Sequence, residues 1–279
     1  MRRGRADTDV FFRDDDLGAL SPEARHVITL MAERDVPVNY QLVPKLVTPT
    51  SAAGLVSVRR DAAGLVRLNQ HGWTHETVIK GRPTPAELAG HPSRDEQRRR
   101  IVAGREHLSS LLGEAHDRRV FTPPNHAYDR TTLKLLAECG FDIISAGYRV
   151  DPVARAVYRL GRLAGRVELG GRAVSRHGTV GPTGLRELSV SVNVDMNGRG
   201  ERVTRTGAEL VTLFDRARAV TETVGVMLHH ECWVSGERDA KTAALIDLVD
   251  HIRSAPGCRL ATIEDIADRL AGSPAAAPG

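Results

Sequence analysis

Short apolar runs and longer amphipathic stretches alternate along most of this chain. The short runs, rich in branched and aromatic residues, predict strands, and the longer stretches predict helices. The predicted strands lie at 10–16, 38–43, 65–69, 119–125, 141–145, 188–194 and 224–228. The predicted helices lie at 22–34, 51–60, 92–112, 131–139, 207–220 and 241–253, and a last strand–helix pair spans 259–270. This alternation predicts a parallel sheet with crossover helices.

Two segments interrupt the alternation. Residues 80–92 are rich in proline and glycine and predict a loop. Residues 153–194 consist of short apolar pieces with glycines, which predict irregular β structure and an insertion. No linker-like stretch divides the interior, so residues 1–271 are predicted to form one domain. Residues 272–279 are rich in alanine, proline and glycine and are predicted to be disordered.

Polar side chains that can carry chemistry lie at or just after the carboxyl ends of five of the predicted strands. In parallel α/β barrels, catalytic groups gather at the carboxyl ends of the strands. Each group alone has a plain explanation as turn chemistry or helix capping, but five such strand ends in one chain favour a functional site. The groups are Asp14, Asp15 and Asp16, then His71 and His75, residues 123–126, Asp195, and finally His229 and His230.

The segment His71-Gly72-Trp73-Thr74-His75 indicates a metal site. If the backbone turns helically here, His71 and His75 lie on one face and both rings can reach one ion. The three consecutive carboxylates at 14–16 repel one another, and a cation between them lowers that cost. One carboxylate and two imidazoles are a suitable ligand set for a catalytic zinc ion. The competing interpretation is that both histidines lie on the surface without a function, and the aspartate cluster argues against it.

The composition fits a globular protein, with 41% hydrophobic and 27% charged residues. The net charge is +4 and the pI about 9.2. The densest arginine run, 98–100, lies in a predicted helix, where it is expected to form a solvent-exposed face. We therefore expect no nucleic-acid partner. Three separated cysteines fit a reducing compartment. We recognise no signal peptide and no membrane-spanning run, so we expect a cytoplasmic protein without membrane contact. The oligomeric state does not follow from the sequence.

These motifs together resemble those of the polysaccharide deacetylase (NodB-homology, carbohydrate esterase family 4) superfamily. The family has an Asp-Asp pair after its first strand, H-(S/T)-x-x-H, a proline-containing third motif, an acidic fourth motif and a Leu-His fifth motif. The corresponding segments are Arg13-Asp14-Asp15-Asp16, the His71 to His75 segment, Phe121-Thr122-Pro123-Pro124-Asn125, Val194-Asp195-Met196 and Leu228-His229-His230. The match runs from residue 10 to about 265, in the family's order. It implies a distorted, incomplete (β/α)7-type barrel.

The resemblance also implies a metal and its ligands. Asp16, His71 and His75 would hold a divalent ion, with zinc expected and cobalt or nickel acceptable to the same donors. Asp15 would then be the general base. An alignment shifted by one residue, with Asp14 as base and Asp15 as ligand, is the competing assignment. Under the preferred alignment Asp14 stays within the strand end, and its replacement by asparagine is expected to be mild.

Further roles follow from the same resemblance. His229 would protonate the leaving amine, and His230 is the alternative acid or a packing residue. Trp73 and Tyr128 lie near strand ends and are expected to border the substrate groove, although a buried tryptophan that braces the histidines is an equally good interpretation. The residues expected to contact substrate are Trp73, Pro124, Asn125, Tyr128, Asp195 and His230.

The chain departs from the family pattern at three positions. Phe121 stands where the third motif has an arginine that pairs with the catalytic aspartate, and Arg13 or Arg119 is the candidate replacement. The tryptophan that follows the fourth-motif aspartate is absent, and Leu17 replaces the glycine after the Asp pair. These differences concern the sugar subsite more than the metal, so the substrate need not be a polymer.

The function implied is metal-dependent removal of an N-acetyl group from an amino sugar or a related small amide. The substrate would be a small molecule or glycan inside the cell. Two alternatives remain open on the sequence alone. One is deformylation, or hydrolysis of a cyclic amide or ureide, at the same metal site. The other is a non-catalytic ligand-binding protein that has kept the fold.

Overall fold

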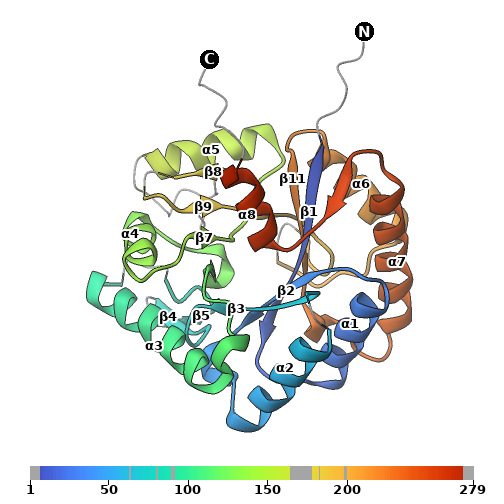
Figure 1. The fold of residues 1–279 in the computed structure, drawn as a ribbon. Coiled ribbons are helices and arrows are strands. Elements are labelled where there is room, and N and C mark those ends of the chain that lie inside the picture. The colour runs from blue at the N-terminus through green and yellow to red at the C-terminus, as the bar shows by residue number, and fades with distance from the viewer. Residues whose placement is uncertain are drawn as a thin grey trace.

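A curved, mostly parallel sheet forms the centre of the computed structural model, with helices packed around it (Figure 1). The structure describes residues 7–62, 64–79, 81–88, 92–163, 178–181, 183–197 and 200–272. The parallel strands are β1 (Thr8–Leu17), β2 (Val38–Leu42), β3 (Val66–His71), β6 (Val120–Thr122), β7 (Ile143–Ile144), β9 (Arg186–Glu187), β10 (Val190–Asn193) and β11 (Thr223–Leu228).

The sheet closes because one extended stretch, which contains β9 and β10, pairs with the strands at both of its edges. β9 pairs with β7, and β10, which follows within a few residues, pairs with β11. Between them, Leu188 N–H donates to the carbonyl of Ile144 and Val190 N–H to that of Ala146. Counting β9 and β10 as one position, seven parallel positions surround the centre. The predicted distorted, incomplete (β/α)7-type barrel is therefore confirmed.

Most helices lie within a few residues of their predicted bounds, because their capping signals are local. Ser21 accepts a hydrogen bond from Ala24 N–H, and Thr48 forms a capping box with Ser51. The helices are α1 (Pro22–Glu33), α2 (Pro49–Asp61), α3 (Arg94–Leu112), α4 (Arg130–Glu138), α5 (Pro152–Leu163), α6 (Gly207–Arg218), α7 (Arg238–Ser254) and α8 (Ile263–Gly272).

The amino-terminal end of the barrel is covered by the C-terminal elements. β12 (Cys258–Leu260) pairs with the start of β1, and α8 follows it. Glu264 of α8 accepts hydrogen bonds of 2.8 Å from the side chains of both Asn39 and Asn69, inside the barrel. Because side chains fill the amino-terminal end of the barrel, a functional site is expected at the opposite end, where the carboxyl ends of the strands lie.

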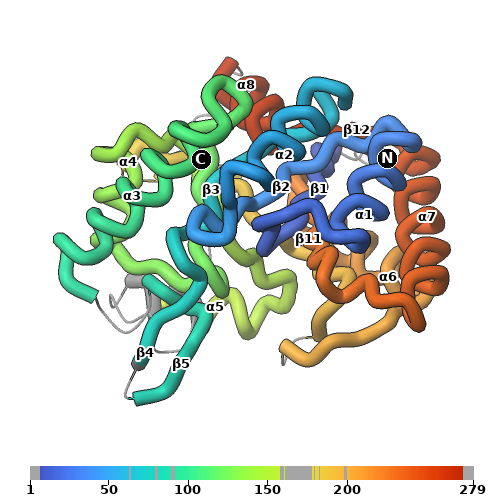
Figure 2. The backbone as a smooth tube through the Cα atoms, turned by 90° about the horizontal axis from the view of Figure 1, so that it is seen from below, coloured from blue at the N-terminus to red at the C-terminus, as the bar shows by residue number. Residues whose placement is uncertain are grey.

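Two predicted irregular segments contain regular elements. Residues 152–163 form helix α5, so the prediction of irregular β structure from residue 153 is wrong there. The predicted loop at 80–92 contains β5 (Arg82–Thr84), which pairs with β4 (Thr77–Ile79) as a hairpin that projects from the barrel (Figure 2). Disorder is predicted for residues 272–279; Gly272 ends helix α8, so the prediction is wrong there, and residues 273–279 lie outside the described residues.

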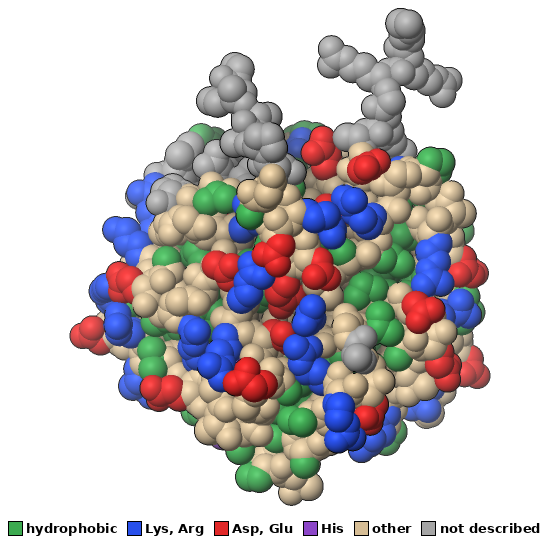
Figure 3. Space-filling view, viewed as in Figure 1, with side chains coloured by type: hydrophobic (Ala, Val, Ile, Leu, Met, Phe, Trp, Pro, Cys, Tyr) green, Lys and Arg blue, Asp and Glu red, His purple; other side chains and the backbone are tan. Residues whose placement is uncertain are grey.

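The arginine run of α3 is used in ion pairs within the chain. Arg98 pairs with Glu138 at 3.1 Å, while Arg99 and Arg100 both reach Glu96 at 2.7 Å. On the face of the molecule in Figure 3, Lys and Arg side chains are interspersed with Asp and Glu. Among the described residues, no helix is long and apolar enough to cross a membrane.

Candidate metal centre

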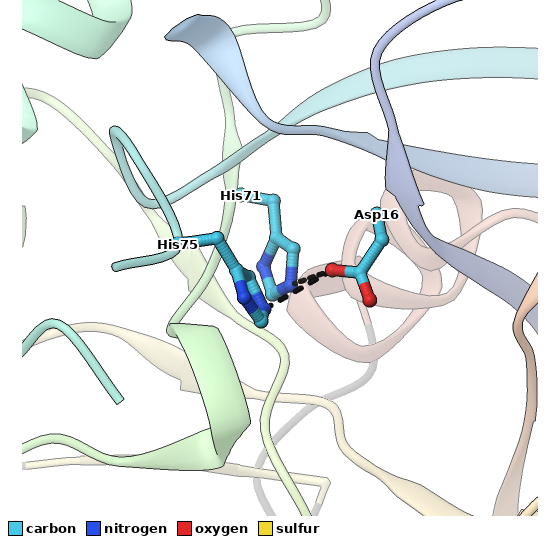
Figure 4. Close-up of side chains that lie close together, drawn as sticks. All are labelled: Asp16, His71 and His75. Atoms are coloured by element: carbon cyan, nitrogen blue, oxygen red, sulfur yellow. Dashed lines mark ion pairs between the residues drawn. The ribbon is translucent and has the colours of Figure 1, made fainter. Parts of the chain in front are cut away.

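Three side chains converge where β1 and β3 end. Asp16 Oδ1 lies 3.2 Å from His71 Nε2 and 3.1 Å from His75 Nε2. Figure 4 shows the carboxylate of Asp16 directed at both rings. The three ligand atoms all lie within 4.8 Å of one another. These are the residues that the sequence selects as ligands.

A break in the regular strand explains how neighbouring aspartates reach one cavity. Side chains alternate along a strand, so Arg13 and Asp15 share one face and Asp14 faces the other way. At Asp16 the backbone is left-handed, with φ 68°, and the pairing of β1 with β2 shifts register here. This irregularity turns Asp16 back to the side of Asp15. Asp15 and Asp16 therefore both line the cavity, and Asp14 does not.

The backbone between the two histidines is a turn and not the helix that the sequence suggested. His71 ends β3, and both Gly72 and His75 have positive φ, 57° and 58°. Buried Glu87 holds this turn, because its carboxylate accepts hydrogen bonds of 2.7–2.8 Å from the N–H groups of residues 73, 74 and 75. A Cβ at Gly72 would lie 2.4 Å from Pro124 Cγ, so glycine is required there on both grounds.

The donor set fits a divalent cation. His71 Nδ1 lies 3.0 Å from the carbonyl oxygen of Thr122, which can only accept, so Nδ1 carries the proton and Nε2 presents a lone pair. That lone pair faces Asp16 Oδ1, which is buried and has no hydrogen-bond donor among the described residues. Two acceptors in contact repel each other, and a cation between them removes the conflict.

The charges around these ligands partly favour the metal-binding forms. Burial opposes ionisation of Asp16, but the adjacent imidazoles hold its pKa well below the ordinary value. Burial, together with His71, lowers the pKa of His75 and favours the neutral ring. For His71 burial acts in the same sense, yet contact with Asp16 and the charge of Asp15 raise its pKa. A proton therefore competes with a metal ion at His71.

Arg13 supplies the charge that is missing from the third motif. Its Nε lies 2.7 Å from Asp15 Oδ1 and its Nη2 2.8 Å from Asp15 Oδ2, and both side chains are buried. Nη1 donates to the carbonyl and hydroxyl oxygens of Ser145 after β7. The other candidate, Arg119, forms exposed ion pairs with Asp142 and Asp268 instead.

His229 faces the cavity and is positioned through its backbone. Its N–H donates to Asp195 Oδ2 at 2.8 Å, and Lys241 Nζ lies 3.2 Å from Asp195 Oδ1. Burial raises the pKa of Asp195, against the effects of these two partners. The imidazole Nδ1 of His229 is buried without a hydrogen-bond partner in the described part of the chain. Asp195 is absent from the cavity wall, so its predicted contact with substrate is wrong.

His230 is directed away from the cavity. Its Nδ1 lies 2.9 Å from Asp14 Oδ2, and its backbone N–H donates to Asp14 Oδ1 at 2.9 Å. Burial opposes protonation of the ring, but Asp14 raises the pKa of His230 to about 9. His230 is therefore a packing residue paired with Asp14, and its predicted substrate contact is wrong.

The cavity beside the three ligands has a volume of about 440 Å³, within the range of small-molecule sites. Its wall includes two catalytic candidates, the metal triad, the predicted strand-end residues Asn125 and His126, and two amides, Asn193 and Asn197, that the sequence did not single out. Asn125 and His126 both have positive φ, 52° and 56°, a strained conformation common at functional sites. The wall residues are Asp15, Asp16, His71, His75, Pro85, Asn125, His126, Asn193, Met196, Asn197, Gly200, Met227 and His229.

The remaining predicted substrate residues have different positions. Tyr128 is 1% exposed within the apolar cluster beneath α4, so its predicted place at the groove is wrong. Pro124 is buried behind the turn at Gly72 and is also absent from the cavity wall. Trp73 lines a neighbouring groove of about 800 Å³, with its ring edge-on to that of His107. Its contact with substrate stays a prediction.

Comparison with known proteins supports the fold and the resemblance to the family. Residues 14–144 match the family model named polysaccharide deacetylase. The chain is similar in structure to a protein from Mycobacterium smegmatis that is assigned as a polysaccharide deacetylase, with 19% identity, a TM-score of 0.65, and coverage of 97% of this chain and 93% of that one.

Two further solved structures share the fold. Puue allantoinase has 14% identity and a TM-score of 0.64, with coverage of 98% of this chain and 93% of that one. A family 4 acetyl xylan esterase from Clostridium thermocellum, in complex with a cobalt ion, has 14% identity and a TM-score of 0.55, with coverage of 96% and 93%. A search of curated proteins gave no match.

Proposed function

Because its motifs, its fold and the match over residues 14–144 make this chain a member of the polysaccharide deacetylase superfamily, we propose that it is a metal-dependent amide hydrolase. Its reaction would remove an N-acetyl group from an amino sugar or a related small amide. The metal would be a divalent ion, with zinc the first choice for this donor set and cobalt or nickel acceptable.

One observation carries the proposal. The three metal-ligand candidates share a cavity with a paired carboxylate, Asp15, and with an imidazole, His229, so a ligand set, a base and an acid meet in one place. If the three aspartates at 14–16 only formed a structural turn, no pair of histidines would be needed beside them. A ligand-binding protein without activity would have no need for all five groups.

The residues divide the reaction between them. A divalent ion held by Asp16, His71 and His75 would supply Lewis acidity at the scissile carbonyl and lower the pKa of a water molecule. The carboxylate of Asp15 would accept the proton of the attacking water, and Arg13 holds that carboxylate in place. His229 would donate a proton to the departing amine nitrogen. Asn125, on the cavity wall, would contact the substrate.

The test is metal content followed by activity. We expect one divalent ion per chain in protein purified without chelator, and acetate release from a panel of N-acetyl amino-sugar metabolites. N-formyl analogues in the same panel separate deacetylation from deformylation. Metal far below stoichiometry, together with no binding or activation by added zinc, cobalt or nickel, would reject the metal site.

We further propose that the protein acts in the cytoplasm on small molecules, without nucleic acid or membrane.

Hydrolysis of a cyclic amide or ureide is the second candidate. Two observations favour it. One is the similarity to Puue allantoinase over nearly the whole chain. The other is the presence of Asn125 and Asn193 in the cavity wall: the amide of Asn125 can both donate to and accept from such a ring, and Asn193, whose Oδ1 accepts from two backbone N–H groups, can donate through its NH₂ group. Ring opening releases no acetate. Mass analysis of a cyclic-ureide panel for addition of one water therefore distinguishes this activity from deacetylation.

A further inference from the structure

The catalytic cavity continues into a second cavity of about 290 Å³. The two cavities share five wall residues, which come from β10, from β11 and from the segments that follow β6 and β10. A substituent of a substrate bound in the first cavity can therefore extend into the second. The shared residues are His126, Asn193, Met196, Asn197 and Met227.

The wall of the second cavity is cationic. Arg149 and Arg205 lie in it, and none of its described residues is Asp or Glu. Tyr148 and Ser191 add hydroxyl groups to the same wall. Guanidinium groups bind carboxylate and phosphate oxygens with two parallel hydrogen bonds, and hydroxyls complete such sites.

Arg205 keeps donors available for a ligand. Its Nη1 donates to the carbonyl of Val194 at 2.8 Å and its Nη2 to that of Met196 at 2.9 Å. A guanidinium has five N–H donors, so these two bonds do not exhaust it. No carboxylate of the described residues lies within ion-pair distance of Arg205. Burial lowers its pKa, although Asp195 and Glu209 act in the opposite sense.

Ser191 supplies an independent sign of a polar ligand. Its Oγ is buried and has no hydrogen-bond partner among the described residues. A buried hydroxyl without a partner costs free energy, and a bound oxygen atom would satisfy it.

The other groove next to the metal centre is a poorer anion site. It contains Lys45, Arg99 and Arg100, but Glu76 lies in the same wall. Both of its arginines are already bonded to Glu96.

We infer that the second cavity is an anion-binding subsite and that the substrate carries a carboxylate or phosphate group close to its scissile amide. This inference rests on the proposed function for the reaction itself, but the binding of an anion does not depend on it. The subsite would select anionic N-acyl compounds over their neutral parents.

The experiment measures anion binding directly. Inorganic phosphate and malonate are titrated separately into the ¹⁵N-labelled protein at constant ionic strength, and the amide shifts of residues 193, 197 and 205 are followed. We expect saturable binding, weakened about tenfold in Arg149→Gln and in Arg205→Gln, the effect of losing one charge-assisted hydrogen bond. The tighter probe identifies phosphate or carboxylate as the preferred group.

Arg99→Gln is the matched control, because it removes the same charge from the neighbouring groove, and we expect its anion affinity to equal that of the wild type. Thermal unfolding establishes that each variant is folded, and Arg149→Gln covers the case in which loss of Arg205 disturbs residues 194–196. Absence of saturable binding, or equal affinity in the wild type and both folded variants, overturns the inference. Lack of acetate release with anion binding intact would instead reject only the proposed reaction.

Discussion

Arg13 and Asp15 form a two-bonded ion pair, with N–O distances of 2.7 and 2.8 Å, between neighbours on the same face of β1. The family arrangement takes this arginine from the third motif, where Phe121 stands here and is buried in the core. The charge has therefore moved to the strand that carries the aspartate itself. The guanidinium is fixed from across the barrel by Ser145, so its orientation does not depend on Asp15 alone.

We expect Arg13→Lys to lower turnover by about 10²-fold, the cost of misplacing a catalytic group by about an ångström. Lysine keeps the charge but cannot reach both carboxylate oxygens in the planar geometry of arginine. Metal content should not change, because none of the hydrogen bonds of Arg13 goes to Asp16, His71 or His75. Steady-state kinetics and elemental analysis measure both quantities.

Arg119→Lys is the control for that variant. Arg119 pairs with Asp142 and Asp268 on the surface, so its replacement should leave turnover unchanged. Equal losses in the two variants, or full activity in Arg13→Lys, would contradict the assignment of Arg13 as the residue that positions Asp15.

Glu87 gives a second prediction, because it holds the turn that carries His75. Glu87→Gln replaces an acceptor by an NH₂ group that faces backbone N–H donors, so the turn should loosen. We expect metal affinity to fall about 10- to 100-fold, as for other residues that orient metal ligands. Competition with a chromophoric chelator measures it. Glu138→Gln, which removes a carboxylate from an exposed ion pair, should bind metal normally.

The pair of His230 and Asp14 predicts a pH-dependent stability. Asp14 raises the pKa of His230 from 6.5 to about 9 in the folded protein. The stabilisation is thus fully present below pH 6.5 and is lost as the pH rises through about 9, and the shift corresponds to about 3 kcal/mol of unfolding free energy. Urea unfolding at pH 6 and pH 9, with chelator present, measures the difference.

Asp14→Asn should abolish most of that difference. The variant should also be clearly destabilised at pH 6, because Asp14 is fully buried and accepts both of its hydrogen bonds from His230. From the sequence a mild effect is expected for this substitution, and the buried pair with His230 now predicts a strong one. Asp215→Asn is the comparison, since its pair with His251 is half exposed. An Asp14→Asn protein with the wild-type pH dependence would show that another group causes it.

The sequence could predict those features that depend on local patterns. Periodicity and capping residues such as Ser21 and Thr48 located the helices, and strand ends located Asp16, His71 and His75. Helix α5 was missed because its single glycine, Gly161, and the short apolar pieces that flank it in the sequence resemble irregular β structure.

Features that depend on distant contacts could not be predicted. Glu87 lies in a loop with no motif of its own, and its role becomes visible only when its carboxylate meets the turn after His71. Tyr128 follows a strand end, as a groove residue would, but the packing of α4 buries it. The orientation of His230 depends on Asp14, a residue more than two hundred positions earlier.

The last prediction separates the two aspartates of the cavity, whose roles the shifted alignment would exchange. Asp16 Oδ1 contacts both imidazoles, whereas both oxygens of Asp15 are held by Arg13. Asp15→Asn should therefore bind metal nearly as well as the wild type but lose turnover by ~10²-fold or more, the usual contribution of a general base. Asp16→Asn should lose metal affinity. Calorimetric metal titration and single-turnover assays on both variants give the answer, and an Asp15→Asn protein without metal beside an Asp16→Asn protein that retains it would assign the ligand to Asp15.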